Sequence, residues 1–201
     1  SNGTQGVRGM AISPDGRYLA VAHVLSRYQV PTTQLDRGWM NTNAVTVIDT
    51  DEPDKPHPVL LDDPDAGAAN PWGVSFSEDG GKLFVTHAGT HELSVIDFPA
   101  LLERMKREDR SNEPVSERLG FLHGLRTRIA LPLNGPRSVA SDGKNVYVAG
   151  YFSDSLAEIS LKDACKSRAI PLNVPFRPSR EKLGERYFND ASHCFQGWQS
   201  C

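Results

Sequence analysis

Three segments of the chain share one sequence pattern, in which two alternating apolar runs flank a short turn. The segments are MAISPDGRYLAVAH (residues 10–23), VSFSEDGGKLFVTH (residues 74–87) and SVASDGKNVYVAG (residues 138–150). Each is followed, after a gap, by a further apolar run: NAVTVIDT, HELSVIDF or SLAEISL. Repetition at a long period indicates a repeat architecture, in which neighbouring units bury a continuous core between them.

Each repeat predicts four antiparallel β-strands. The first two runs form a hairpin, because a turn with glycine joins them. The later run supplies a third strand, and we predict a fourth at 58–61, 128–131 and 167–170. Four antiparallel strands per repeat are typical of a β-propeller blade, and propellers have about four to eight blades. The predicted fold is therefore all-β: about three four-stranded β-propeller blades in an incomplete ring, with a short helical C-terminal stub.

The repeats are longer than a blade needs. Asp15, Asp79 and Asp142 occupy equivalent turns, 64 and 63 positions apart, whereas a blade usually takes roughly 40–50 residues. We predict that these aspartates cap their turns. The excess lies in insertions at 24–42 and after residue 98, where PALLERMKREDR from position 99 predicts a short amphipathic surface helix.

Composition excludes several classes of protein. The 201 residues are 38% hydrophobic and 23% charged, with a net charge of −3. These values argue against disorder, and no basic patch indicates a nucleic-acid partner. No apolar run approaches the length of a transmembrane segment.

The repeat stops after Leu172, and we place a domain boundary there: residues 1–172 form the blades, and 173–201 form a linker and the start of another unit. Two prolines, at 175 and 178, indicate the linker. Ser179 is a predicted N-cap for a helix whose residues Leu183, Tyr187 and Phe188 share one face.

Two resemblances to known families follow from these segments. The sequences SPDGRYLAVAH and HELSVIDF resemble the YVTN-type β-propeller repeats of bacterial surface and periplasmic proteins. This resemblance covers roughly residues 6–172. The segment LGERYFNDA, followed by CFQGWQSC, resembles the start of a di-haem cytochrome c peroxidase domain of the MauG type. In that family an LG-x-x-LF-x-D helix leads into S-C-x-x-C-H. Here Tyr187 replaces the usual leucine, and Ser200-Cys201 matches the first two letters of the haem motif.

The second resemblance implies a cofactor, haem c, in a longer parent protein. In C-x-x-C-H, two thiols bind the haem covalently and the histidine ligates its iron. Cys201 would be the first cysteine, whereas the second and the histidine would lie beyond this sequence. The chain alone is therefore expected neither to hold haem nor to be catalytic. Its expected partners are the remainder of the propeller, the haem domain and a redox protein, in the periplasm or at the cell surface.

The resemblance also implies a disulfide. If Cys201 serves haem, Cys165 and Cys194 remain as a pair, and c-type haem assembly implies an oxidising compartment in which disulfides persist. We therefore expect a Cys165–Cys194 disulfide that ties the last blade to the haem domain. The alternatives are two buried reduced thiols, or a Cys194–Cys201 bridge.

Three histidines are candidate metal ligands. His23 and His87 end the second strand of their repeats, so they should face the same rim, and His91 lies close by. Imidazole is a common ligand of copper and zinc. The alternative is that these side chains form hydrogen bonds at the blade ends or face the attached domain, because no close metal-binding spacing is present.

The function expected of the parent protein is electron transfer or peroxide-linked oxidation, with the propeller as a docking or substrate-presenting scaffold. Two alternatives come from other classes of protein. One is a non-catalytic YVTN-type binding module. The other is a propeller enzyme, either a lactonase or a metal reductase that uses the histidines.

Overall fold

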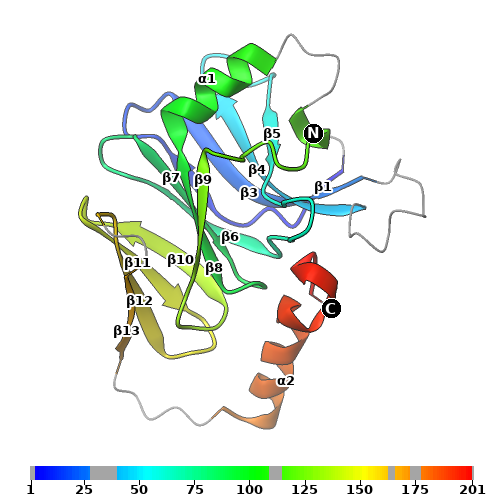
Figure 1. The fold of residues 1–201 in the computed structure, drawn as a ribbon, viewed down its shortest axis with the longest axis vertical. Helices are drawn as coiled ribbons and strands as arrows, with labels where there is room; N and C mark the ends of the chain where they lie inside the picture. The colour runs from blue at the N-terminus through cyan, green and yellow to red at the C-terminus, as the bar shows by residue number, and fades with distance from the viewer. Residues whose placement is uncertain (1–2, 28–39, 109–114, 163–165, 173–177, 201) are drawn as a thin grey trace.

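Three antiparallel sheets follow one another along the chain (Figure 1). The computed structural model describes residues 3–27, 40–108, 115–162, 166–172 and 178–200. Blade 1 contains β1 (Thr4–Gln5), β2 (Met10–Ile12), β3 (Tyr18–Ser26), β4 (Asn41–Asp49) and β5 (His57–Leu60). Blade 2 contains β6 (Pro71–Phe76), β7 (Lys82–His87), β8 (Glu92–Asp97) and β9 (Arg126–Ala130). Blade 3 contains β10 (Pro136–Ser141), β11 (Asn145–Gly150), β12 (Ser155–Ser160) and β13 (Ser167–Pro171).

The sheets confirm the predicted blades, with one difference. Blades 2 and 3 are four-stranded meanders in chain order, from β6 to β9 and from β10 to β13. In blade 1, β3 is longer than expected and pairs with two strands on one side. Met10 of β2 lies opposite Val21, whereas Thr4 of β1 lies opposite Leu25. Blade 1 therefore has five strands where four were predicted, because the long β3 leaves room for a second short partner.

The hairpin turns form as the sequence predicts. Asp15 accepts a hydrogen bond from the Arg17 backbone N–H at 3.1 Å, and Asp79 accepts one from that of Gly81 at 2.9 Å. Asp142 accepts hydrogen bonds from the backbone N–H groups of Lys144 and Asn145, at 2.9 and 2.7 Å. The predicted turn-capping role of the three aspartates is confirmed.

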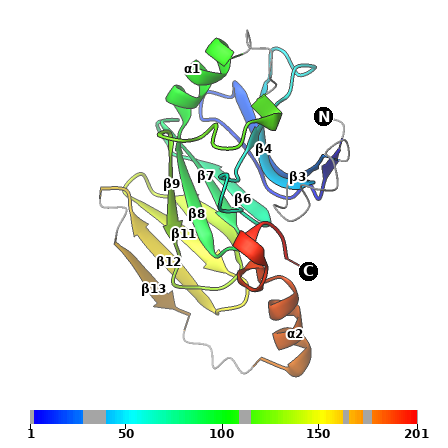
Figure 2. The ribbon, with the colours of Figure 1, turned by 45° about the vertical axis from the view of Figure 1, so that its right-hand side comes forward.

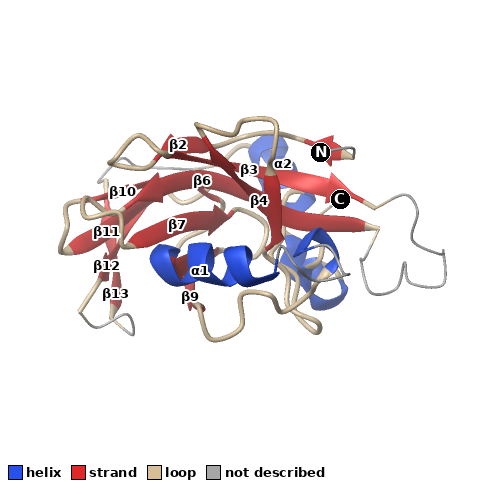
Figure 3. Ribbon diagram, turned by 90° about the horizontal axis from the view of Figure 1, so that it is seen from above, coloured by secondary structure: helices blue, strands red, loops and turns tan. Residues whose placement is uncertain are grey.

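The core lies between successive blades, which pack face to face (Figure 3). Between blades 1 and 2, small residues of β3 and β4 meet large ones of blade 2, among them Leu83 and Ile96. Between blades 2 and 3, Phe84 and Leu93 pack against Val146 and Ile159. Because adjacent residues of β7 point to opposite faces, Leu83 and Phe84 serve different cores.

Within the described residues, two α-helices lie outside the sheets. The insertion in blade 2 forms α1 (Phe98–Glu108), one residue earlier than predicted, and its Leu101 and Met105 are buried against the core of blades 1 and 2. Near the C-terminal end, α2 (Arg180–Phe188) begins after the predicted N-cap Ser179. It leads into two 3-10 turns, η3 (Ala191–His193) and η4 (Phe195–Gly197), and a third such turn, η2 (Val115–Glu117), follows α1 along the chain. None of the described helices is long and apolar enough to cross a membrane.

Candidate functional site

Residues 178–200, which we call the C-terminal segment, lie on one end of the blades, at the ends of β6 and β8 (Figure 2). This end, where β2, β6 and β10 begin and β7 and β11 end, is called the rim. Two backbone hydrogen bonds attach the segment. The N–H of Gly67 donates to the carbonyl of Gln196 at 2.8 Å, and the N–H of Ala191 donates to that of Gly89 at 2.9 Å. The segment is therefore packed on the rim through its main chain.

The contact is tight enough to require glycine. A Cβ atom on Gly67 would lie 2.3 Å from the Cα of Trp198. A Cβ on Gly89 would lie 3.1 Å from the Cβ of Ala191 and 2.9 Å from that of Ala69. Trp198 is 2% exposed, so its indole is buried although it lies near the end of the chain. The two glycines let the segment approach the rim at backbone distance.

A buried carboxylate organises the same contact. Asp62 accepts hydrogen bonds from the backbone N–H of Asn43 at 2.7 Å, from its side-chain Nδ2 at 2.8 Å and from the N–H of Ala68 at 2.7 Å. The same Nδ2 donates to the carbonyl of Trp198 at 3.0 Å. Asp62 thus orients the asparagine that holds the C-terminal segment.

Burial raises the pKa of Asp62 from 3.8 to about 6, against the opposing effect of its hydrogen bonds from Asn43 and Ala68. The folded state therefore binds this proton more tightly than the unfolded state, and Asp62 contributes more stability as the pH falls through about 6. Between pH 7.5 and 5, we expect the unfolding free energy of the wild type to rise by about 1.4 kcal/mol relative to that of Asp62→Asn.

Urea unfolding at several pH values tests this linkage. The difference between the wild type and the variant is the relevant quantity, because the buried histidines titrate in both proteins. Asp54→Asn, at an exposed position, is the matched control and should leave the pH dependence unchanged. A pH-independent difference between the wild type and Asp62→Asn would contradict the assignment.

Cationic and aromatic side chains alternate along the rim, in what we call the cation–aromatic ladder. The guanidinium carbons of Arg8 and Arg137 lie 4.4 and 4.1 Å from the ring centre of Trp72. Arg137 also lies 3.7 Å from the ring of Tyr151, over which the ammonium of Lys182 lies at 3.8 Å. The ladder joins the starts of all three blades to α2. Cation–π contacts contribute about 0.5–2 kcal/mol each.

His23 and His87 do lie at equivalent places on the rim. In each of them, however, both ring nitrogens form hydrogen bonds with neighbouring residues. Nδ1 of His87 is 3.1 Å from the carbonyl of Ala68, so it carries the proton, and Nε2 accepts from the hydroxyl of Ser94 at 2.7 Å. His23 repeats this arrangement, with the carbonyl of Val24 at 3.1 Å and the hydroxyl of Thr46 at 2.6 Å. These contacts fit the hydrogen-bonding alternative for the two histidines.

Burial lowers the pKa of both imidazoles, and for His87 the charges of Arg128 and Arg126 lower it further. Both are therefore neutral at pH 7. Within the described part of the chain, no group of three histidine, cysteine, aspartate or glutamate side chains is arranged to hold a metal. The convergence of His23, His87 and His91 on a metal stays a prediction.

His91 faces the C-terminal segment. Its backbone is left-handed, with φ 57°, a conformation that is uncommon for a residue other than glycine. Its Nδ1 accepts from the N–H of Gly135 at 3.1 Å, and its Nε2 lies 3.2 Å from Oδ1 of Asp190 without hydrogen-bond alignment. The contact between His91 and Asp190 joins blade 2 to the segment that follows the blades.

Two of the predicted cysteine sites lie outside the described residues. Cys201, the predicted haem-attachment residue, comes directly after Ser200, whose hydroxyl accepts from Nδ2 of Asn70 at 2.7 Å. Cys165 is likewise outside, whereas Cys194 is half-buried at the junction of η3 and η4. The Cys165–Cys194 disulfide therefore remains a prediction.

The C-terminal segment turns aromatic side chains away from the blades. Tyr187, Phe188 and Phe195 are 56%, 60% and 71% exposed. The predicted shared face of α2 is thus turned mainly to solvent, because Lys182 and Arg186 make the contacts with blade 3.

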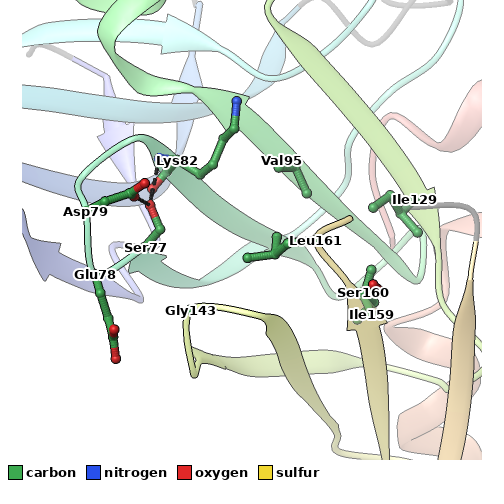
Figure 4. A pocket seen from close by; sticks show the side chains of 10 residues that line it. All are labelled: Ser77, Glu78, Asp79, Lys82, Val95, Ile129, Gly143, Ile159, Ser160 and Leu161. Carbon is green, nitrogen blue, oxygen red and sulfur yellow. Dashed lines mark hydrogen bonds between the residues drawn. The ribbon is translucent and has the colours of Figure 1, made fainter. Parts of the chain in front are cut away.

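A cavity of about 400 Å³ lies between blades 2 and 3, at the end opposite the rim (Figure 4). Its walls include Val95, Ile129 and Leu161. Two of its three charged lining residues already have partners, since Asp79 accepts from Ser77 at 2.6 Å and Lys82 pairs with Asp97. We assign no chemistry to this cavity.

Sequence reasoning missed the rim residues that matter most. Arg8 and Trp72 both lie five positions before the first serine of their turns, Ser13 and Ser77, and Arg137 lies four before Ser141. Alignment of the repeats could have indicated that these side chains meet where the innermost strands begin. No comparable signal pointed to Asp62, because its partners come from separate turns and from the chain end.

Comparison with known proteins relates the blades to one enzyme. Hydrazine synthase subunit beta of Kuenenia stuttgartiensis is 30% identical over 157 residues, which are 76% of this chain and 40% of that protein. The solved structure of Kuenenia stuttgartiensis hydrazine synthase matches with a TM-score of 0.69 and 28% identity, over 79% of this chain and 46% of the matched chain. The chain thus spans less than half the length of either relative.

A more distant structure shares only the fold. Dihydro-heme d1 dehydrogenase NirN in complex with DHE matches with a TM-score of 0.53 and 16% identity, over 85% of this chain and 29% of that one. No family model matches the chain. The described blades form a β-propeller whose ring is not closed by these three sheets, and the chain is homologous to part of hydrazine synthase subunit beta.

Proposed function

We propose that this chain is the propeller portion of a periplasmic or cell-surface haem protein, acting in electron transfer or peroxide-linked oxidation. Its role there is to dock the start of a c-type haem domain on the rim. The observation that carries the proposal is the attachment of the C-terminal segment, through Gly67, Gly89 and the Asp62–Asn43 pair, directly before Cys201.

The domain boundary after Leu172 belongs to this proposal. Residues 178–200 would be the first part of the haem domain, and its exposed aromatic residues Tyr187, Phe188 and Phe195 would be covered by the rest of that domain. Haem bound at a C-x-x-C-H motif supplies one-electron redox chemistry. This chain contributes Cys201 as one anchoring group, and the rim orients the main chain that leads to it.

The comparisons support the haem-related setting. Hydrazine synthase subunit beta is by its name one subunit of an enzyme, and the name of the NirN enzyme contains dihydro-haem d1. The partners proposed for this chain are a haem domain and a redox protein. The Cys165–Cys194 disulfide would then tie blade 3 to the haem domain.

The haem assignment predicts covalent haem in the complete gene product. Produced in a periplasm with c-type haem assembly, the wild type should retain haem on a denaturing gel and show a c-type pyridine haemochrome spectrum. Cys201→Ser should weaken this attachment, because it removes one thioether. Cys194→Ser should leave the amount of haem per folded protein unchanged. A wild type without covalent haem, or an unaltered Cys201→Ser spectrum, would contradict the proposal.

The disulfide has its own test. Alkylation without reductant followed by mass spectrometry should leave both Cys165 and Cys194 unlabelled and detect the peptide that joins them. Labelling of both thiols would exclude the bridge, and a Cys194–Cys201 peptide would identify the competing one.

A further inference from the structure

Two arginines of the cation–aromatic ladder bring positive charge together without a described acidic partner. Arg8 precedes β2 and Arg137 lies in β10, and both guanidinium groups contact the ring of Trp72, within 4.4 Å of its centre. Burial, and then the charge of Arg137, lower the pKa of Arg8. Like charges held this close oppose folding unless something else compensates them.

Neither guanidinium forms an ion pair or hydrogen bond with any residue that the structure describes. Nη1 of Arg8 and Nε of Arg137 are buried and lack an acceptor. Glu185 interacts with Arg137 through its charge: the pKa of Glu185 is lowered first by Lys182, its ion-pair partner at 2.9 Å, and also by the charge of Arg137. A buried donor without an acceptor lowers the stability of the folded state.

Another pair of arginines, Arg126 and Arg128, shows how guanidinium groups find acidic partners elsewhere in this structure. Arg126 pairs with Asp63 at 2.5 Å and donates to the carbonyl of Leu61. Arg128 pairs with Asp63 at 3.2 Å and with Glu92. The pair at Trp72 has the same charge, but no described carboxylate forms an ion pair or hydrogen bond with either guanidinium, so both are available to an external anion.

Arg8, but neither Arg137 nor Trp72, is among the described residues that line a cavity on the rim. The cavity has a volume of about 250 Å³ and none of its described lining residues is acidic. Side-chain amides of Asn41, Asn43 and Asn70 and the hydroxyl of Ser200 line it together with Arg8, although Asn43 already donates to Asp62 and Asn70 to Ser200. A guanidinium next to neutral hydrogen-bonding groups is the arrangement that recognises carboxylates and other oxyanions.

We propose that Arg8, Arg137 and Trp72 form an oxyanion-binding site on the rim that takes a carboxylate-bearing ligand. The carboxylate accepts hydrogen bonds from the guanidinium N–H groups. The ring of Trp72 holds both arginines through cation–π contacts. Two sources could supply the carboxylate: a free small dicarboxylate, or the propionate side chains of a haem attached nearby. The site stands on the contacts of the blades and does not depend on the haem assignment.

Titration of the chain with succinate, followed by calorimetry and tryptophan fluorescence, tests the proposal, with sodium chloride of equal ionic strength as the blank. The wild type should bind, and Arg8→Gln combined with Arg137→Gln should weaken binding by about tenfold or more. Arg107→Gln, at an exposed position in α1, is the matched control and should bind as the wild type does.

Circular dichroism should show that the double variant keeps its sheets, because neither guanidinium bonds to a described residue. Equal affinity in the wild type and the double variant, or no binding of succinate to the wild type, would overturn the proposal. Cys201→Ser should bind succinate normally, which separates this site from the haem assignment. Loss of succinate binding only in the haem-loaded complete protein would identify the haem carboxylates as the natural ligand.

Discussion

Replacing Gly67 by alanine is expected to detach the C-terminal segment from the rim while the blades remain folded. The new Cβ would lie 2.3 Å from the Cα of Trp198 and 2.5 Å from the carbonyl of Gly197, and both are backbone atoms that no rotamer change can move. Detachment would break the Gly67–Gln196 hydrogen bond and expose the indole of Trp198. Burial of such a side chain stabilises by about 1.5–3 kcal/mol.

Limited proteolysis and tryptophan fluorescence measure this effect. The Gly67→Ala protein should be cleaved rapidly within 178–200, and its emission should shift to the red, with unchanged far-ultraviolet circular dichroism. Gly184→Ala is the matched control, because its Cβ would meet nothing within 4 Å and it lies inside α2. That variant should resist cleavage at least as well as the wild type, since alanine favours helix by about 1 kcal/mol over glycine. Equal cleavage of both variants would contradict the tight rim contact.

Replacing Phe84 by alanine is expected to lower the free energy of unfolding by about 3–5 kcal/mol. Phe84 is fully buried and packs with Leu93, Val146 and Ile159 between blades 2 and 3. The substitution leaves a cavity in a rigid layer between two sheets, which cannot close without moving a whole blade. Urea unfolding followed by circular dichroism measures the loss.

Phe195→Ala is the matched control for this substitution. Phe195 is 71% exposed in the described structure, and surface substitutions usually change stability by about 0.5 kcal/mol or less. Comparable losses for the two variants would mean that blades 2 and 3 do not share the core described here.

The repeats predicted the blades because the determinants of a hairpin are local. Alternation of apolar residues set the strands, and Asp15, Asp79 and Asp142 capped turns within a few positions of themselves. The helix after Asp97 and the N-cap Ser179 were also readable from short windows of sequence. The short strand β1 was not, because only its pairing with the end of β3 creates it.

The contacts at the rim could not be predicted from short windows of sequence, because they join residues that are far apart in the chain. The contact of Arg8 with Trp72 and Arg137 joins three repeats, and Asn43 meets Trp198 across nearly the whole chain. Such contacts follow from the packing of blades, which no single window encodes. His87 ends β7 as predicted, whereas His23 does not end its strand, because β3 continues to Ser26. The partners of their ring nitrogens depended on the carbonyls and hydroxyls around them, which no local pattern encodes.

Hydrogen exchange of the Gly67 and Ala191 amides, followed by NMR in the intact chain, tests the docking of the C-terminal segment most directly. Both N–H groups are bonded across the contact, to Gln196 and Gly89 respectively. We predict that both amides exchange at least about a hundredfold more slowly than in an unstructured peptide, and that Gly67→Ala abolishes the protection of Ala191. Exchange of both amides at the unstructured rate in the wild type would show that the segment is not held on the rim, and would contradict the account.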